Sequence, residues 1–339
     1  MKLEEIYKLA IAMGIKADPR GKRDVEKLLE KTQTAYEKLE ADEKEDYDTD
    51  RLTNPFADTR ILYGDTSTEV KSMIVGVDME TQELLLADRL REKGTKIDLV
   101  MGHHPEGKAL AALADVMGVQ ADVWHNMGVP INVGEAVIEG RQSEVMRLML
   151  PLNHQRPVRT AELLDIPLMC VHTPCDNLVT SFLQKHFDKK GPGLTLGEVR
   201  DDLRKIPEYR EAARMNAGPT IVVGKESRRA GRVLIDMTGG TGGPAESMEK
   251  LAAAGVGTLI GMHISEKNRE EAEKQKINVV IAGHNSSDSI GINLFIDELE
   301  KKGVKIIPCS GLIRVNRLKK KASPAKKGKS RSRKETARS

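Results

Sequence analysis

The fold is decided by the stretch at positions 256–309, VGTLIGMHISEKNREEAEKQKINVVIAGHNSSDSIGINLFIDELEKKGVKIIPC. Short apolar runs at its start, middle and end are separated by charged stretches in which apolar residues recur at helical spacing. Such runs indicate buried strands, and the stretches between them indicate amphipathic helices. Strands that alternate with helices form largely parallel sheets covered by helices. This segment therefore predicts an α/β fold.

The same alternation extends through most of the preceding chain. Strand-like runs occur at 72–78, 96–102, 167–172, 219–224 and 231–238, and helical patterns lie between them. Residues 1–50 are charged and carry two helical patterns, whereas residues 54–65 contain Pro and Asp and read as irregular. The two halves of the chain thus share one strand–helix rhythm.

The composition argues against a membrane protein, a secreted protein and a disulfide-stabilised protein. The chain has 339 residues, of which 39% are hydrophobic and only 3% aromatic, so its core must be built from Leu, Ile, Val, Met and Ala. No apolar run reaches the roughly 18–20 residues of a membrane helix, and the opening residues do not form a signal peptide. Three cysteines without a CxxC pair fit a reduced compartment. We therefore expect a cytoplasmic protein.

The net charge of +3 is the sum of an acidic body and a strongly basic tail. From residue 317 to the end there are 11 Lys and Arg and one acid, which leaves 43 basic and 50 acidic residues at positions 1–316. The tail at 317–339 has few apolar residues and is predicted to be disordered. It is either a solubilising extension or a weak, salt-dependent nucleic-acid contact, and no aromatic platform accompanies it.

The placement of the eight histidines is the most informative feature of the sequence. Three apolar runs, DLVMG, PLMCV and VVIAG, lead directly into the pair His103-His104, His172 and His284. In open α/β sheets, ligands collect beyond the carboxyl ends of the strands. Imidazoles that three strands deliver to this edge could therefore converge on one point.

Two of these histidines carry a carboxylate four residues further on. Asp176 follows His172, and Asp288 follows His284. At a helix start, a spacing of four places both side chains on one face, where they can chelate an ion. Four imidazoles and two carboxylates exceed the needs of one tetrahedral ion and suit two ions that share a bridging carboxylate. Each motif alone is common in exposed loops and on helices, so the prediction rests on their combination.

Three further features allow more than one interpretation. His263 also follows an apolar run and could be an additional ligand, a group behind the ligands, a substrate contact or a structural residue. Cys175 could reach an ion but is better explained as a small buried hydrophobe. The glycine-rich stretch at 238–243, TGGTGG, could cradle phosphate or form a tight turn for close packing, although it lacks the P-loop Lys-Ser/Thr.

With these motifs assembled, the sequence resembles the NGG-interacting-factor-three-like family, whose bacterial members are often labelled GTP cyclohydrolase I type 2. The resemblance covers positions 54–317. It rests on NPFADTRILYG, IVGVD, GHHP, HTPCD, GGTGG and AGHNSSDSIG, which occur in the family's order.

The resemblance implies two related, intertwined α/β lobes with a metal site in the cleft between them. It also implies a homohexameric ring and two divalent ions per chain, which could be Zn, Mn, Fe, Co or Ni. The implied ligands are His103, His104, His172, Asp176, His284 and Asp288. Residues 1–53 would be an N-terminal helical extension, and 54–316 the family core, whose lobes divide near 180–230.

The sequence departs from the family at several site positions. Asp288 stands where members usually have Glu, and Asp is one methylene shorter, so the coordination could differ. HTPCD replaces the usual HTNLD, and MHISE stands where many members have TGE. The substrate could therefore differ from that of the labelled enzymes.

Two functions follow as hypotheses. The first is a divalent-metal-dependent hydrolase with a dinuclear centre, acting on a small-molecule substrate such as a nucleotide or purine ring, as the GTP cyclohydrolase label suggests. The second is a non-catalytic metal-binding or partner-binding ring protein. The sequence identifies no catalytic residue beyond the ligands, and neither hypothesis involves a membrane.

Overall fold

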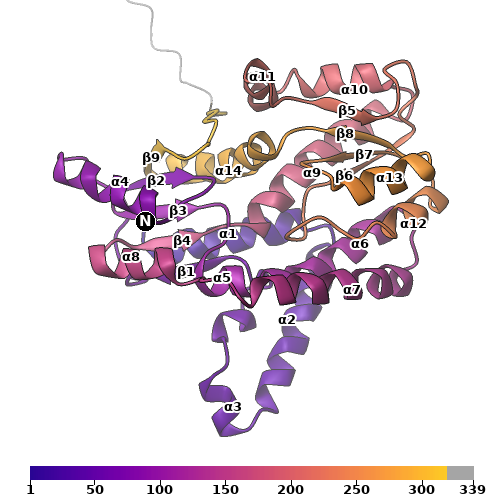
Figure 1. Ribbon diagram of the computed structural model, residues 1–339. Helices are drawn as coiled ribbons and strands as arrows, with labels where there is room; N and C mark the ends of the chain where they lie inside the picture. Colours follow the sequence, from indigo (N-terminus) through magenta and orange to yellow (C-terminus); the bar gives the residue numbers. More distant parts are fainter. Residues whose placement is uncertain (319–339) are drawn as a thin grey trace, which may run out of the picture.

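Two sheets organise the chain in the computed structural model, which describes residues 1–318 (Figure 1). The first sheet has the order β1-β4-β3-β2-β9, and the second has the order β5-β8-β7-β6. The strands of the first sheet are β1 (Arg60–Tyr63), β2 (Ser72–Gly76), β3 (Leu99–Gly102), β4 (Leu168–Cys170) and β9 (Lys305–Pro308). Those of the second are β5 (Thr220–Val223), β6 (Arg232–Asp236), β7 (Val256–Gly261) and β8 (Asn278–Ile281).

Both sheets are largely parallel, as predicted. Only the edge strands β1 and β5 run antiparallel, to β4 and β8 respectively. The chain leaves the first sheet after β4, builds the whole second sheet, and returns to the first as β9, which pairs with β2. The α/β prediction with two largely parallel sheets is therefore confirmed, and the order of the strands intertwines the two lobes.

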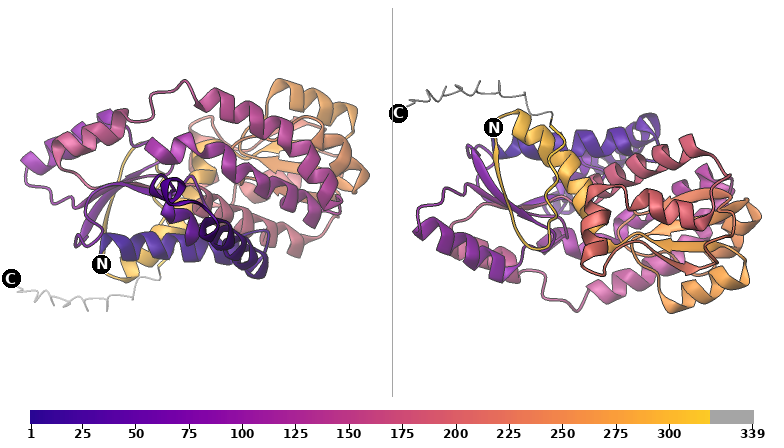
Figure 2. Two further views of the ribbon diagram at one scale, coloured as in Figure 1. Left: turned by 90° about the horizontal axis from the view of Figure 1, so that it is seen from below. Right: turned by 90° about the horizontal axis from the view of Figure 1, so that it is seen from above.

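Helices cover both faces of each sheet. Helices α1 (Leu3–Ala17), α9 (Thr173–Lys190) and α14 (His284–Lys301) contribute side chains to the cluster on one face of the first sheet, and α4 (Thr81–Glu92) and α8 (Arg156–Leu164) to that on the other. The second sheet is covered by α9, α14, α10 (Leu196–Leu203) and α11 (Pro207–Arg214) on one face. Helices α6 (Val119–Asn126), α7 (Ile131–Met149), α12 (Ser247–Ala253) and α13 (Glu266–Lys274) cover its other face. Helices α9 and α14 therefore belong to the cores of both lobes (Figure 2).

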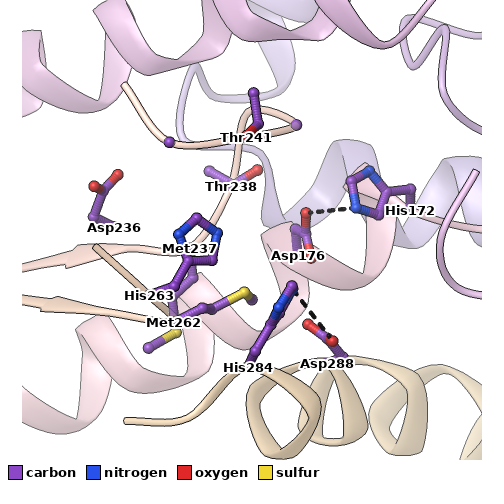
Figure 3. Close-up of a pocket in the computed structure, with 12 residues that line it drawn as sticks. His172, Asp176, Asp236, Met237, Thr238, Thr241, Met262, His263, His284 and Asp288 are labelled. Carbon is purple, nitrogen blue, oxygen red and sulfur yellow. Dashed lines mark ion pairs between the residues drawn. The ribbon is translucent and has the colours of Figure 1, made fainter. Parts of the chain in front are cut away.

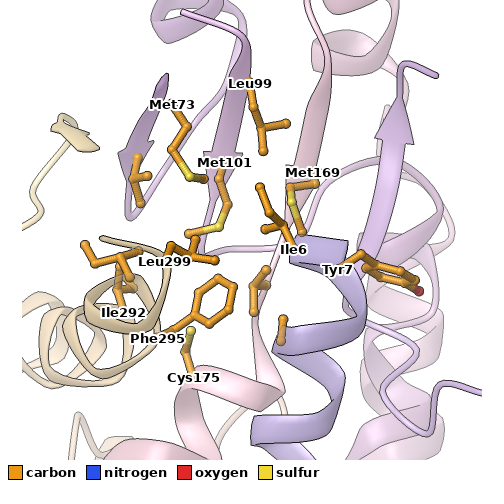
Figure 4. Close-up of a cluster of buried hydrophobic side chains, with 14 of the residues drawn as sticks. Ile6, Tyr7, Met73, Leu99, Met101, Met169, Cys175, Ile292, Phe295 and Leu299 are labelled. Carbon is orange, nitrogen blue, oxygen red and sulfur yellow. The ribbon is translucent and has the colours of Figure 1, made fainter. Parts of the chain in front are cut away.

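Methionine fills much of the first-lobe core, as the low aromatic content requires. Met73, Met101 and Met169 from three adjacent strands are completely buried and lie near Phe295 of α14 (Figure 4). The flexible thioether side chain fills irregular gaps that aliphatic residues would leave. Each large apolar side chain buried in this way contributes roughly 1.5–3 kcal/mol to folding.

Residues 1–53 are helical, but they are not uniform in their packing. Helix α1 is part of the first-lobe core, where Ile6 is completely buried. By contrast, α2 (Lys22–Glu37) and α3 (Ala41–Glu45) project from the body (Figure 1). Beyond them, Asp48 near η1 (Thr49–Leu52) pairs with the buried guanidinium of Arg60 at 2.9 Å. The predicted domain boundary at residue 53 stays a prediction.

The local predictions failed at two places. Residues 54–65 were expected to be irregular, but they contain β1, a four-residue edge strand that forms because β4 offers a free side for pairing. The helical pattern at 107–118 is split into α5 (Gly107–Ala111) and the 3-10 helix η2 (Leu113–Gly118). Most of the tail prediction, residues 319–339, lies outside the described residues. Within the described part of the chain, no helix has the length and apolar character needed to cross a membrane.

Candidate metal centre

All six predicted ligands come together at one edge of the two sheets. His103 and His104 directly follow β3, whereas His172 and Asp176 lie at and just inside the start of α9, which follows β4. His284 and Asp288 occupy the first turns of α14, which follows β8. Two strands of the first sheet and one of the second therefore deliver the six side chains from their carboxyl ends, as the position of sites in α/β folds predicts.

One set of potential ligand atoms is buried, and we call it the inner group: His103, Asp176 and Asp288. The Nε2 atom of His103 lies 3.4 Å from a carboxylate oxygen of Asp176 and 3.6 Å from one of Asp288. His172 adjoins this group, because its Nε2 lies 3.8 Å from the other oxygen of Asp176. Two atoms that each bind one tetrahedral ion at about 2.1 Å lie about 3.4 Å apart, so these spacings suit a shared ion.

A second set is more exposed, and we call it the outer group: His104, His284 and Asp288. The Nε2 atoms of both histidines lie 3.7 Å from the same oxygen of Asp288. The side chain of His284 is 45% exposed, and that of His104 is 29% exposed. Because Asp288 belongs to both groups and offers one oxygen to each, it has the placement of a bridging carboxylate.

Whether these residues suit a metal ion can be judged from the hydrogen bonds of their carboxylates. Both oxygens of Asp288 and one oxygen of Asp176 are buried and accept no hydrogen bond from the described residues. A buried carboxylate oxygen without a partner costs free energy, because it has lost its water and gained nothing in exchange. These oxygens all lie close to imidazole Nε2 atoms. Residues of this kind, in this arrangement, could hold a metal ion.

Three of the imidazoles are oriented by an acceptor behind them. The Nδ1 atom of His103 lies 3.0 Å from the backbone oxygen of Val171, which places a proton on Nδ1 and leaves Nε2 free. The Nδ1 atoms of His172 and His104 lie 2.8 Å and 2.5 Å from the carboxylates of Asp58 and Asp78. Metal-binding histidines characteristically have such partners, which fix the tautomer and the ring orientation. His284 has no such partner among the described residues.

In the metal-free state, the pKa values of the inner and outer histidines are shifted in opposite directions. Burial alone would lower the pKa of His103, but the carboxylates of Asp176 and Asp288 raise it well above its ordinary value. Conversely, burial would raise the pKa of Asp288, but His103 and the other two nearby imidazoles lower it. The pKa of His284 is lowered, mainly by burial. An ion that binds His103 therefore competes with a proton more strongly than an ion that binds His284.

The centre opens into two connected spaces. A small cavity of about 60 Å³ is lined by four of the ligands and, on the second lobe, by Asp236, His263 and the segment 237–242 (Figure 3). This volume can hold a few water molecules. A groove of about 840 Å³ shares Asp236, Thr241, Gly242 and His263 with that cavity and continues between α7 and the start of α13. A small molecule could thus reach the centre through the groove.

The glycine-rich stretch at 238–243 forms the wall between these two spaces. Its carbonyl groups accept hydrogen bonds from Gln120, Arg141 and Asn268, which fix the turn from three helices. A Cβ atom at Gly239 would lie 2.6 Å from the side chain of Gln120, and the φ of Gly239 is +91°. The turn does not lead directly into a helix, because α12 begins only at Ser247. These observations favour the tight-turn interpretation over the phosphate cradle.

The structure also shows what the sequence interpretation missed. Asp58 and Asp78, which orient two of the histidines, were not predicted, although both lie within the quoted motifs NPFADTR and IVGVD. His263 belongs to none of the possible ligand groups among the described residues, and its ring lies 5.2 Å from that of His284. Cys175 is completely buried in the first-lobe hydrophobic cluster (Figure 4), in agreement with its interpretation as a small hydrophobe.

Comparison with known proteins identifies which solved structures share this fold. No family model matches the sequence, and no curated protein matches it. A solved NIF3 superfamily protein from Sphaerobacter thermophilus matches with a TM-score of 0.71 and 22% identity, over 92% of this chain and 99% of that chain. The chain has the NIF3 fold. The resemblance to the NGG-interacting-factor-three-like family is therefore confirmed at the level of the fold, and the match extends beyond positions 54–317.

More distant NIF3-fold structures also match. Reduced HcgD from Methanocaldococcus jannaschii has a TM-score of 0.44 and 18% identity, over 73% of this chain and 87% of that chain. A Bacillus cereus protein related to NIF3 has a TM-score of 0.39 and 11% identity, over 74% and 89% of the two chains. At these scores the likeness adds nothing about the site.

Proposed function

We propose that this NIF3-fold chain is a divalent-metal-dependent hydrolase with a dinuclear centre. The observation that carries the proposal is the set of three buried carboxylate oxygens without hydrogen-bond partners, each opposite an imidazole Nε2. In the metal-free protein only the protonated imidazole of His103, at 3.4–3.6 Å, partly compensates these oxygens. Two cations would compensate all of them at once.

The six residues divide between two ion positions. His103, His172 and Asp176 would hold the inner ion, His104 and His284 the outer ion, and Asp288 would bridge the two. Asp is shorter than the Glu that the family usually has here, but the Asp288 carboxylate already lies within 3.6–3.7 Å of imidazoles in both groups. Imidazole and carboxylate ligands suit Zn, Mn, Fe, Co or Ni.

An open site favours catalysis over metal storage. Two bound ions would supply an activated water and polarise the substrate. The chain itself leaves a small cavity beside the outer group and connects it to a large groove, which gives water and substrate access. A protein that only stores or displays metal needs neither space. Hydrolysis of a nucleotide or purine ring, as in the GTP cyclohydrolase label, is the substrate proposal that the family resemblance supports.

The experiment that tests this proposal is elemental analysis of protein purified without chelator, beside a His103→Ala/Asp176→Ala double variant and a His125→Ala control. We expect two ions per chain in the wild-type and control proteins, with loss of at least the inner ion in the double variant. Hydrolysis of GTP, other nucleotides and phosphoesters is then assayed with the matching metal. No metal uptake after incubation with Zn, Mn or Fe would overturn the ligand assignment. Two ions without any hydrolysis would favour the non-catalytic metal-binding or partner-binding ring.

Three other sequence predictions stay proposals. The homohexameric ring rests on the family resemblance alone, and the cytoplasmic location on composition. Weak nucleic-acid binding by the basic tail concerns residues that lie mostly outside the described part. Of the tail, Arg317 is described, and it pairs with the buried carboxylate of Glu208 at 2.7 Å.

A further inference from the structure

Asp236 is a carboxylate that the metal centre does not use. It ends strand β6, is half-buried, and lines both the small cavity over the centre and the large groove. Figure 3 shows it on the other side of His263 from the ligand carboxylates. It belongs to none of the possible ligand groups among the described residues. Its position therefore fits contact with a substrate rather than with an ion.

No group in the described chain compensates this carboxylate. Burial raises the pKa of Asp236 to about 6, and no neighbouring cation or hydrogen-bond donor opposes the effect. A half-buried carboxylate with no donor from the chain is less well stabilised than a fully solvated one, and such groups recur at functional sites. Asp236 therefore has the character of a binding group whose partner comes from outside the chain.

The other charges of the groove are already balanced. Arg141 donates a hydrogen bond to Glu144 at 2.8 Å, and Lys267 lies 3.9 Å from Glu246. The charged residues that line the groove comprise these two cations and three carboxylates, so Asp236 is the unmatched negative charge. A ligand that complements the groove would bring a cation or a strong hydrogen-bond donor to this one position.

We propose that Asp236 binds an amidine, guanidine or protonated amine group of the substrate, while the substrate's reacting atom lies at the metal centre. The proposal rests on the proposed hydrolase function, which it deepens by naming the substrate class. An amidinium or guanidinium offers two parallel N–H donors to the two oxygens of a carboxylate, which is the geometry of a strong bidentate pair. The test below needs no catalysis.

The size and lining of the groove agree with a partly apolar ligand. Its volume of about 840 Å³ lies within the range of small-molecule sites. Val137, Met248, Leu259 and Ile264 line it together with the glycine-rich turn. An aromatic or conjugated ring could pack on these side chains, while its nitrogen substituent reaches Asp236.

Benzamidine, benzamide and benzoate form a matched set of probes, because they share a ring and differ in the charge and donors of one substituent. Their affinities are measured by isothermal titration calorimetry with the full chain, metal-loaded and after chelator treatment. After chelator treatment we expect benzamidine to bind more tightly than the other two, and in the metal-loaded state we expect it to bind more tightly than benzamide, because benzoate can also coordinate the ions. Asp236→Asn should weaken benzamidine binding by roughly 10-fold or more. Glu144→Gln, which removes a paired carboxylate from the same groove, should leave it within about 2-fold.

The metal content of each variant shows whether a loss of benzamidine binding comes from misfolding or from the missing carboxylate. An Asp236→Asn protein that keeps its ions is folded at the centre, so a lost benzamidine signal is then attributable to the carboxylate. Equal benzamidine binding by wild type and Asp236→Asn would overturn the proposal. If the variant does not fold, chelator-treated wild-type protein that binds benzoate as well as benzamidine, or fails to bind benzamidine, overturns it too. Absence of metal or of hydrolysis, with benzamidine selectivity retained, would overturn the proposed hydrolase and leave the assignment of Asp236 as a cation-binding carboxylate standing.

Discussion

The inner and outer ligand groups share Asp288 but differ in how firmly the fold holds them. His103 in the inner group is buried, and the backbone oxygen of Val171 fixes its Nδ1. The side chain of His284 in the outer group is 45% exposed and has no acceptor behind it among the described residues. A preorganised ligand loses less conformational entropy when an ion binds. We therefore expect the inner ion to bind tightly and the outer ion to exchange, which suits a position that water and substrate also approach.

The largest expected effect comes from the residue that the two groups share. Asp288→Ala should remove the outer ion, which keeps only His104 and His284, and should weaken the inner ion, which keeps His103, His172 and Asp176. His284→Ala should remove only the outer ion. Elemental analysis of the dialysed proteins measures both effects. Asp297→Ala provides a control on the same helix, since Asp297 pairs with Arg314 away from the centre. An Asp288→Ala protein that bound either ion with unchanged affinity would show that the two positions do not share this carboxylate.

A smaller effect should distinguish the two groups through the residues behind the histidines. Asp58→Asn should weaken the inner ion's affinity by roughly 10–100-fold, because the amide orients His172 less well and no longer raises its basicity. Asp78→Asn should act in the same way on His104 and hence on the outer ion. Competition with a chelator of known affinity measures each ion separately. If both substitutions weakened the same ion, the division into inner and outer groups would be wrong.

The six candidate ligand residues could be picked out from the sequence because their signals are local. Each histidine directly follows an apolar run, and each ligand carboxylate lies one helical turn after a histidine, so strand ends and helical spacing suffice to find them. The parallel sheets could be predicted for the same reason, since each strand and each helix carries its own periodicity.

The remaining features depend on contacts between distant segments. Asp58 lies 114 positions from His172, and nothing near Asp58 in the sequence indicates that it meets an imidazole. Strand β1 exists only because β4 is beside it. Helix α1 reads as an ordinary amphipathic helix, and its burial among strands of the first sheet depends on the whole lobe. In the sequence, Asp236 is an ordinary residue at the end of a strand. That it has no cation or hydrogen-bond donor nearby becomes visible only when all its neighbours in the folded chain are known.

The smallest expected effect is a pH dependence of thermal stability in the metal-free protein. The folded-state pKa of His103 is raised above 6.5, so its protonated form stabilises the fold. This contribution is complete below about pH 6.5 and is lost as the pH rises through the folded-state pKa. Metal-loaded protein should show the opposite trend, because ions bind neutral imidazoles and bind more strongly at higher pH. The difference in Tm between metal-loaded and metal-free protein should therefore widen as the pH rises.

Calorimetry at a series of pH values from about 6 upward measures this difference, with roughly 1–2 °C expected for each kcal/mol of stabilisation lost. In His103→Gln, the metal-free protein should lose the pH dependence that this histidine causes. His284→Gln is the matched control, because the pKa of His284 is shifted downward, in the opposite direction to that of His103. If His284→Gln abolished the dependence and His103→Gln did not, the proton would belong to the outer group. The inner position would then be the one that is ready to receive an ion without releasing a proton, and the order of ion binding inferred from burial would be reversed.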